Sequence, residues 1–271
     1  MQVLVAVEEL DAGAAHLLEV GRRLARAFGG GLTVFHATGP RAGPGEVEAT
    51  GRALAGLAGD ARTDVRPAGE GGASAAIVEA VARHQCELVV MGTEGADPVI
   101  NRFLGSTAHQ VLEAGVCPVL IVHPEVGLRA PGEVVVMVAV ADPLFSARAI
   151  QHGVHLAQAL QARVKVVHVG SREEDPVATL LGSQGHPSQA IVAAAAQPFR
   201  DAGLGVEGRV VPNYQGVAEE LAHAADLVDA DVIVVGSSGR LDLGAWLLGS
   251  IAEAVLHRSR RPVLVVPSLT V

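Results

Sequence analysis

One stretch of sequence occurs twice in this chain and decides its fold. Residues 88–95 read Leu-Val-Val-Met-Gly-Thr-Glu-Gly, and nine residues later comes Gly-Ser at 105–106. Residues 232–239 read Val-Ile-Val-Val-Gly-Ser-Ser-Gly, and again nine residues later comes Gly-Ser at 249–250. Each copy joins an apolar, β-branched run to a glycine-rich loop and then to a segment of helical period. A strand–loop–helix unit is therefore predicted at two places with the same spacing.

The repeat continues on both sides of this motif. The further matching pairs are 118–122 with 262–266, 4–7 with 137–140, and 32–36 with 164–168. The matching segments are offset by about 130–145 residues, which is far longer than a solenoid repeat and indicates one duplicated domain. We expect a first domain at 1–126, a linker at 127–132 in a stretch rich in proline and glycine, and a second domain at 133–271.

Each half alternates short apolar runs with longer segments rich in alanine and leucine. Most of the short runs are continuously apolar rather than alternating, as a parallel sheet buried on both faces requires. Strands are predicted at 2–7, 31–36, 62–67, 87–91 and 118–122, and at 133–140, 163–169, 205–211, 231–235 and 262–266. Helices are predicted at 12–28, 45–58, 72–84 and 103–114, and at 145–161, 187–202, 215–228 and 246–257. The predicted fold class is α/β: two tandem doubly wound five-stranded parallel sheets of order 3-2-1-4-5, flanked by helices.

Composition argues against several classes of protein. Hydrophobic residues make up 49% of the 271 residues and charged residues 18%, enough apolar material for two packed cores. The 20 basic and 29 acidic side chains leave a formal charge of −9, so we expect no nucleic-acid partner and no membrane partner. Two cysteines are too few for a disulfide framework. No apolar run is long enough to span a membrane and no signal peptide is visible, which favours a soluble protein of a reducing cytoplasm.

The residues of the repeated motif suit a phosphate-binding site. A glycine at the end of a strand lets the backbone turn sharply and approach a ligand. The second glycine opens a helix, whose N–H groups and dipole favour an anion. The hydroxyl of Ser106 or Ser250 would cap that helix or donate to a phosphate oxygen. The alternative is that the glycines only form turns and the serines only cap, but the repeated spacing favours a phosphate site in at least one half.

Carboxylates follow the first strand of each half. Glu8 and Asp142 lie at the carboxyl edge of these strands, beside the point where doubly wound sheets bind ligands. A carboxylate there accepts hydrogen bonds from a ribose or a base. For Asp142 and Asp11 a helix N-cap is the competing interpretation. Neither a P-loop nor a Gly-x-Gly-x-x-Gly fingerprint after the first strand is present.

With these motifs in place, the chain resembles the universal stress proteins in their tandem two-domain form, over nearly its whole length. The resemblance implies a stress-response regulator that binds ATP or another adenine nucleotide, with or without Mg²⁺, and acts on a client protein that the sequence does not identify. It implies no enzyme beyond slow ATP hydrolysis. It also implies that the halves pack as a pseudo-two-fold dimer through 118–122 and 262–266, which would otherwise be unpaired edges. A homodimer of the whole chain is compatible with it.

The resemblance also assigns ligand-binding positions. In the first half these are Ala6, Val7, Glu8, Ala37, Met91, Gly92, Gly95, Gly105, Ser106 and Thr107. In the second half they are Ala139, Val140, Val169, Val235, Gly236, Gly239, Gly249, Ser250 and Ile251. No catalytic residue and no metal ligand is assigned.

Both halves depart from the family pattern. Glu8 replaces the expected aspartate in the first half, and Ala141 stands at that position in the second. Glu94 places a negative charge in the first phosphate loop, whereas Ser237 and Arg240 make the second loop better suited to phosphate. The first half is thus the better candidate for ribose and the second for phosphate. Binding by both halves or by one remains open.

Two other functions compete with this interpretation. An ATP-pyrophosphatase-type ligase would carry its phosphate loop after the first strand, and such a loop is absent. A protein-interaction module with vestigial clefts is compatible with Glu94 and Ala141. Two histidines that end the second strands, His36 and His168, are expected to bond to the backbone rather than to a ligand.

Overall fold

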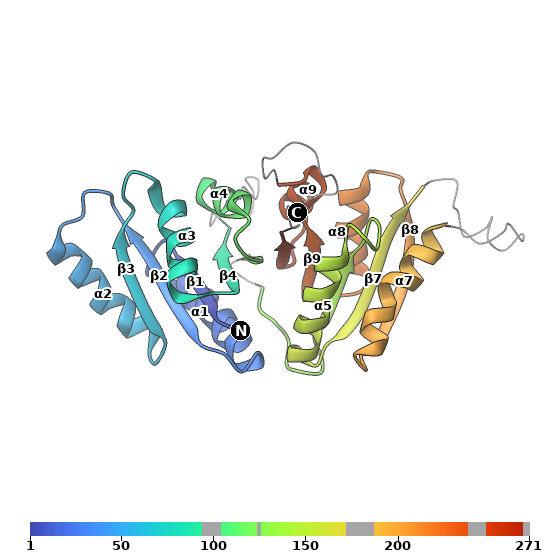
Figure 1. The fold of residues 1–271 in the computed structure, drawn as a ribbon, viewed down its shortest axis with the longest axis horizontal. Coiled ribbons are helices and arrows are strands. Elements are labelled where there is room, and N and C mark those ends of the chain that lie inside the picture. The colour runs from blue at the N-terminus through green and yellow to red at the C-terminus, as the bar shows by residue number, and fades with distance from the viewer. Residues whose placement is uncertain (94–103, 124–125, 172–186, 238–247, 268–271) are drawn as a thin grey trace, which may run out of the picture. The chain divides into compact units, whose positions relative to one another are not determined.

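The computed structural model describes residues 1–93, 104–123, 126–171, 187–237 and 248–267 (Figure 1). It divides into two compact units, Met1–Gly127 and Leu128–Val271. Each unit is an α/β domain built around parallel strands. The predicted packing of the two halves through their fifth strands stays a prediction.

The first unit contains five parallel strands in the order β3-β2-β1-β4-β5. The strands are β1 (Val3–Val7), β2 (Leu32–Thr38), β3 (Arg62–Pro67), β4 (Leu88–Gly92) and β5 (Val119–Val122). The helices are α1 (Ala12–Ala27), α2 (Pro44–Ala58), α3 (Gly72–His84) and α4 (Ser106–Ala114). This is the strand order 3-2-1-4-5 that the sequence predicts.

The second unit repeats this order as β8-β7-β6-β9-β10, again with every pair parallel. Its strands are β6 (Val135–Ala139), β7 (Arg163–Gly170), β8 (Val206–Pro212), β9 (Val232–Gly236) and β10 (Val263–Val266). Its helices are α5 (Ala147–Leu160), α7 (Pro187–Asp201), α8 (Val217–Leu227) and α9 (Ser250–Arg258). The duplication read from the sequence is confirmed at the level of topology.

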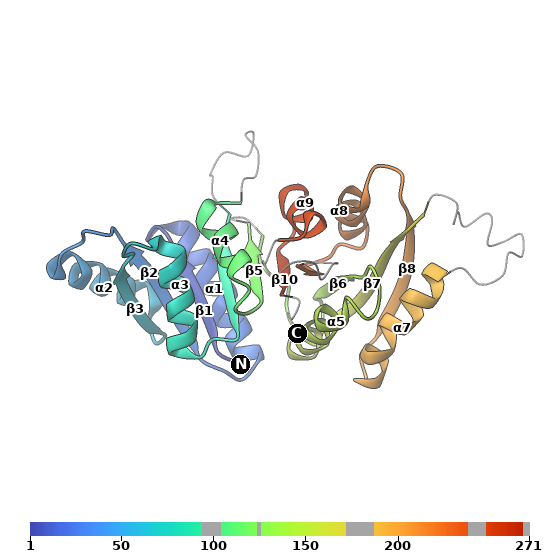
Figure 2. The same cartoon turned by 45° about the horizontal axis from the view of Figure 1, so that its top comes forward.

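The central strands are buried on both faces. All residues of β1 and of β6 are buried, because helices cover both sides of each sheet (Figure 2). The first helix of each unit lies close to the first strand. A Cβ on Gly21 of α1 would stand 2.2 Å from Val5 Cγ2, and one on Gly153 of α5 would stand 3.0 Å from Val138 Cγ2. Glycine at these positions lets the helix backbone approach the sheet.

The last helix of each unit begins later than the sequence predicts. The expected helices at 103–114 and 246–257 begin instead at Ser106 and Ser250. The cause is the backbone of the preceding glycine. Gly105 (φ −59°, ψ 151°) and Gly249 (φ −61°, ψ 140°) are extended and form the N-caps. The apolar residues before each glycine continue the helical pattern in sequence, so the pattern alone places the start too early.

Candidate functional site

The predicted ligand positions lie at the carboxyl edge of each sheet. Strand β1 pairs with β2 on one side and with β4 on the other, so the chain order reverses at β1. Ligands of doubly wound folds bind at such a point. Val7 ends β1 and Gly92 ends β4, and Val140 and Gly236 hold the same places at β6 and β9. The topology therefore brings the strand-end members of the predicted set to one edge in each unit.

In the first unit this edge ends in the N-terminus of α4. The backbone N–H of Thr93, directly after β4, donates to the carbonyl of Val122 at 3.2 Å. Gly105 is the N-cap of α4, and its carbonyl accepts from the N–H of His109 at 2.9 Å. Being glycine, this N-cap residue offers no side chain to cap the helix. Gly105 rather than Ser106 is the N-cap, so Ser106 is not the capping residue that the competing interpretation requires, and its side chain is exposed.

The second unit shows the same arrangement with one added contact. The N–H of Ser237 donates to the carbonyl of Val266 at 2.8 Å, and Gly249 is the N-cap of α9, again without a side-chain cap. The N–H of Gly249 donates to the carbonyl of Ser237. This bond joins the two ends of the glycine-rich loop and fixes where α9 begins. Ser250 and Ile251, in the first turn of α9, are exposed.

The first glycine of each motif meets different surroundings. A Cβ on Gly92 would stand 3.3 Å from Leu17 Cδ1 of α1, so packing within the unit already favours glycine there. A Cβ on Gly236 would meet nothing within 4 Å. The open space beside Gly236 leaves room for a ligand to approach the backbone of the second unit.

The carboxylates that follow the first strand of each unit fall into two groups: two bond to nearby backbone N–H groups, and one is exposed. Asp11 is the N-cap of α1, and its Oδ1 accepts from the N–H of Ala14 at 3.0 Å. Asp142 Oδ1 accepts from the N–H of Leu144 at 2.8 Å, within the turn that precedes α5. Both therefore have the local backbone role that competes with ligand binding. Glu8 is exposed directly after β1, where it is available to a ligand.

The strand-end histidines bond to the backbone, as predicted. His36 Nδ1 lies 3.1 Å from the carbonyl oxygen of Val7, and His168 Nδ1 lies 2.9 Å from that of Val140. A carbonyl only accepts, so Nδ1 carries the proton in both rings. Each histidine thus fastens the second strand to the end of the first, directly beside the candidate site.

The sequence pattern gives no signal for a polar pair at the same edge of the first unit. Thr93 Oγ1 lies 3.3 Å from Nδ1 of the buried His123. The two residues directly follow β4 and β5, whose last residues Gly92 and Val122 are in register. Only the strand register brings them together.

The remaining predicted positions are partly outside the described residues. Gly95 and Gly239 lie outside them, as do Glu94 and Arg240. The others flank the strand ends or follow the N-cap of the last helix. Ala6, Met91, Ala139 and Val235 are buried, whereas Ala37, Val169 and Thr107 are partly exposed.

The cysteines lie away from this edge. Cys86 and Cys117 precede β4 and β5, and both are buried free thiols. Burial raises the pKa of Cys86 to about 11 and that of Cys117 to about 12. Both sulfurs are therefore protonated at neutral pH and lack the thiolate that nucleophilic chemistry needs.

No metal centre is visible in the described part of the chain. Within those residues, no group of three or more His, Cys, Asp or Glu side chains is placed to hold a metal ion. The rings of His152 and His155 on α5 meet edge to face, with centroids 6.3 Å apart. Among the helices that the structure describes, none is long and apolar enough to cross a membrane.

Comparison with known proteins now identifies the family. The family model "Universal stress protein family" matches residues 1–123 and again 135–267. The chain belongs to the universal stress protein family. A universal stress protein of Mycobacterium tuberculosis is 29% identical over 190 residues, which are 67% of this chain and 62% of the relative. This chain therefore spans less than two thirds of that relative's length.

Solved structures support the fold. The crystal structure of a universal stress protein from Archaeoglobus fulgidus has a TM-score of 0.72 and 18% identity, and covers 98% of both chains. A putative universal stress protein from Pseudomonas aeruginosa has a TM-score of 0.66 and 19% identity, and covers 98% of this chain and 93% of its own. At these identities the likeness concerns the fold alone.

Proposed function

We propose that this universal stress protein is a regulator that binds an adenine nucleotide, with ATP as the first candidate. One observation carries the proposal. Helices α4 and α9 each begin at the ligand edge on a glycine N-cap, a residue that has no side chain with which to cap the helix. The first N–H groups of a helix lack partners within the helix, and together with the helix dipole they favour an anion.

The phosphates lie in this proposal against Gly236, Gly249 and Ser250, and in the first unit against Gly92, Gly105 and Ser106. The serine hydroxyls, which do not cap their helices, donate to phosphate oxygens. Glu8 accepts from the ribose in the first unit. The second unit is the better phosphate site because its loop ends are joined and Gly236 faces open space.

Chemistry beyond binding is not part of this proposal. Mg²⁺ would supply charge neutralisation of the phosphates, and the residues at the edge would hold and orient the nucleotide. We propose no catalytic residue, and any hydrolysis of ATP would be slow. A client protein would then distinguish the nucleotide-bound state of this protein from its nucleotide-free state.

Valine at the two N-cap glycines tests the proposal. The φ of Gly105 and of Gly249 is negative, so a valine can adopt this backbone conformation, and its side chain should block the close approach of a phosphate. Equilibrium dialysis against ATP is expected to show weaker binding by Gly249→Val, and loss of binding by the double variant with Gly105→Val.

The matched control is Gly56→Val on the exposed surface of α2, where a Cβ meets nothing within 4 Å. It should bind ATP like the wild type. Unchanged affinity in the double variant would count against phosphate binding at these helix ends. It would favour the second candidate, an interaction module whose clefts are vestigial.

A further inference from the structure

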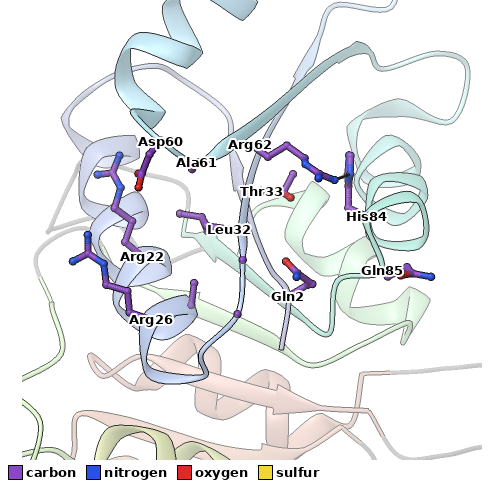
Figure 3. A pocket seen from close by; sticks show the side chains of 13 residues that line it. Gln2, Arg22, Arg26, Leu32, Thr33, Asp60, Ala61, Arg62, His84 and Gln85 are labelled. Carbon is purple, nitrogen blue, oxygen red and sulfur yellow. Dashed lines mark hydrogen bonds between the residues drawn. The ribbon is translucent and has the colours of Figure 1, made fainter.

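A hollow of about 580 Å³ opens in the first unit at the opposite edge of the sheet (Figure 3). It lies where the strands begin. Its walls come from the end of α1, the start of β2, the turn before β3 and the end of α3. This volume falls in the range of small-molecule sites, about 300–1,000 Å³. None of the predicted nucleotide positions lines it.

The walls of this hollow are basic. Arg22, Arg26 and Arg62 line it, and Asp60 is the one carboxylate among the described lining residues. The whole chain carries a formal charge of −9, so the cluster runs against the general charge. Arg26 is exposed and forms no ion pair or side-chain hydrogen bond with another described residue.

Two of the arginines are held in place by neighbours. Arg22 Nη2 donates to the carbonyls of Leu57 and Ala58, at 3.1 and 2.8 Å, and so binds the end of α2. Arg62 Nη1 donates to His84 Nδ1 at 3.4 Å. The Nε2–H of His84 in turn donates to Asp64 Oδ2 at 2.7 Å. This chain of contacts orients the Arg62 side chain along one wall of the hollow, as Figure 3 shows.

Asp64 is already satisfied by other cations. Burial by itself would raise its pKa, but the hydrogen bond from His84 and the charge and hydrogen bond of Arg66 hold it below the usual value. Arg83 adds a further ion pair at 3.1 Å. Asp64 therefore does not cancel the charge of Arg62.

Helix ends alone do not explain this basic lining. Arginine near a helix C-terminus is favoured by the helix dipole, and α1 and α3 end in Arg26 and in Arg83 with His84. The duplicated second unit has the same helix ends and serves as an internal control. The last turns of α5 and α8 contain no basic residue. The fold therefore does not demand the arginines of the first unit.

The equivalent edge of the second unit has a different arrangement of charges, in which the described cations are mostly paired with carboxylates. Thr33 pairs with Arg62 in the first unit, and the repeat-equivalent Lys165 pairs with Glu207 in the second. Lys165 Nζ lies 2.5 Å from Glu207 Oε2, so its charge is neutralised. Gln85, which has φ +52°, is replaced by Asp229, which has φ +51°. Among the described residues, two positions of the hollow that are basic or neutral in the first unit, Arg62 and Gln85, are thus carboxylates in the second.

We propose that this hollow binds a small anion that carries phosphate groups, at a site separate from the nucleotide edge. A guanidinium group presents a planar fork of donors that matches phosphate oxygens. Arg22 and Arg26 lie on one side of Leu32 and Arg62 on the other (Figure 3), and these side chains would supply the donors to the phosphates. The amides of Gln2 and Gln85, which also line the hollow, would hold the remainder of the molecule.

Pyrophosphate is the probe for a test on the full ¹⁵N-labelled chain. Amide NMR signals of Gly31, Ala61 and Gln85, which line the hollow, are expected to shift and to saturate with a Kd below about 1 mM. Citrate, an anion of similar charge without phosphate, separates a phosphate site from a general anion site, and it should bind more weakly than pyrophosphate. The shifts locate the site whether or not ATP binds elsewhere, so this test is independent of the nucleotide proposal.

Charge reversal supplies the matched comparison. The double variant Arg26→Glu with Arg62→Glu changes two exposed side chains and should weaken pyrophosphate binding by at least about tenfold. The control, Arg163→Glu with Arg209→Glu, makes the same charge change on exposed residues of β7 and β8 and should leave binding unchanged.

Four results would overturn the inference. The first is that the NMR shifts do not saturate at a pyrophosphate concentration ten times the expected Kd, and the second is that they are confined to the ends of β1, β4, β6 and β9. The third is that both double variants weaken pyrophosphate binding equally. The fourth is that citrate binds as tightly as pyrophosphate.

Discussion

At the scale of single residues, Asp231 shows how a buried charge is satisfied in the second unit. Its side chain is 4% exposed. It accepts from the backbone N–H of Val135 at 2.7 Å and of Arg129 at 3.0 Å, and from the Arg129 guanidinium at 2.6 Å. Burial by itself would raise its pKa, but these hydrogen bonds hold the pKa below the usual value.

Replacing Asp231 with alanine should destabilise the second unit by about 3 kcal/mol, because buried donors lose their partner. The carboxyl group of an aspartate in an unfolded chain has a pKa of about 4. Since the folded pKa is lower, the stabilisation is present above that pH and is lost as the pH falls through the folded value. Urea unfolding of the wild type and the variant at several pH values measures this. A destabilisation that stays unchanged down to about pH 2 would contradict it.

Ser250 is the residue whose hydroxyl is proposed to meet phosphate. Its replacement with alanine should cost one charge-assisted hydrogen bond, about 1.5–3 kcal/mol, or roughly ten- to a hundredfold in ATP affinity. Folding should be unaffected, since Ser250 is exposed and does not cap α9. Calorimetry on this variant checks the value, with Thr50→Ala on α2 as the control. Equal affinities of both variants would remove the serine from the site.

At the scale of elements, the contact of the first helix with the first strand sets the geometry of each unit. Gly21→Ala should destabilise the first unit by about 1–3 kcal/mol, because the new Cβ would stand 2.2 Å from Val5 Cγ2. Gly56→Ala on the open surface of α2 should instead stabilise by about 0.5–1 kcal/mol through helix propensity. Opposite signs in thermal unfolding are expected. Stabilisation by both changes would show that α1 moves freely away from β1.

The starts of β4 and β5 carry the two buried thiols. With pKa values of about 11 and about 12, Cys86 and Cys117 should react very slowly with a disulfide reagent at about pH 8. Both should react at once in concentrated guanidinium chloride. Rapid modification of the native protein would mean that this edge of the sheet opens readily.

The central strands could be located from sequence because each is a continuous apolar run, and their order follows from the doubly wound topology that alternating strands and helices favour. The runs at 88–92 and 232–236 ended at the glycines that end β4 and β9. Helix starts were less accurate, since a glycine N-cap rather than hydrophobic period decides them. Contacts such as Thr93 with His123, or Arg129 with Asp231, join residues far apart in the chain. Local patterns carry no information about such pairs.

At the scale of the whole molecule, duplication has kept the scaffold and changed the edges. The two units share one strand order and one histidine-to-strand bond. They differ at the ligand edge, where Glu8 and Ala141 occupy equivalent positions. They also differ at the opposite edge, where Arg62 of the first unit is replaced by Glu207 in the second. The packing of the halves through β5 and β10 stays a prediction.

The central claim, that this universal stress protein binds an adenine nucleotide, is tested most directly by calorimetric titration of the full chain with ATP, ADP and AMP. The account predicts saturable binding of at least one of them with a Kd below about 1 mM. ATP should bind more tightly than AMP, because more phosphate groups meet the helix ends. No heat of binding from any of the three at millimolar concentration would contradict the claim.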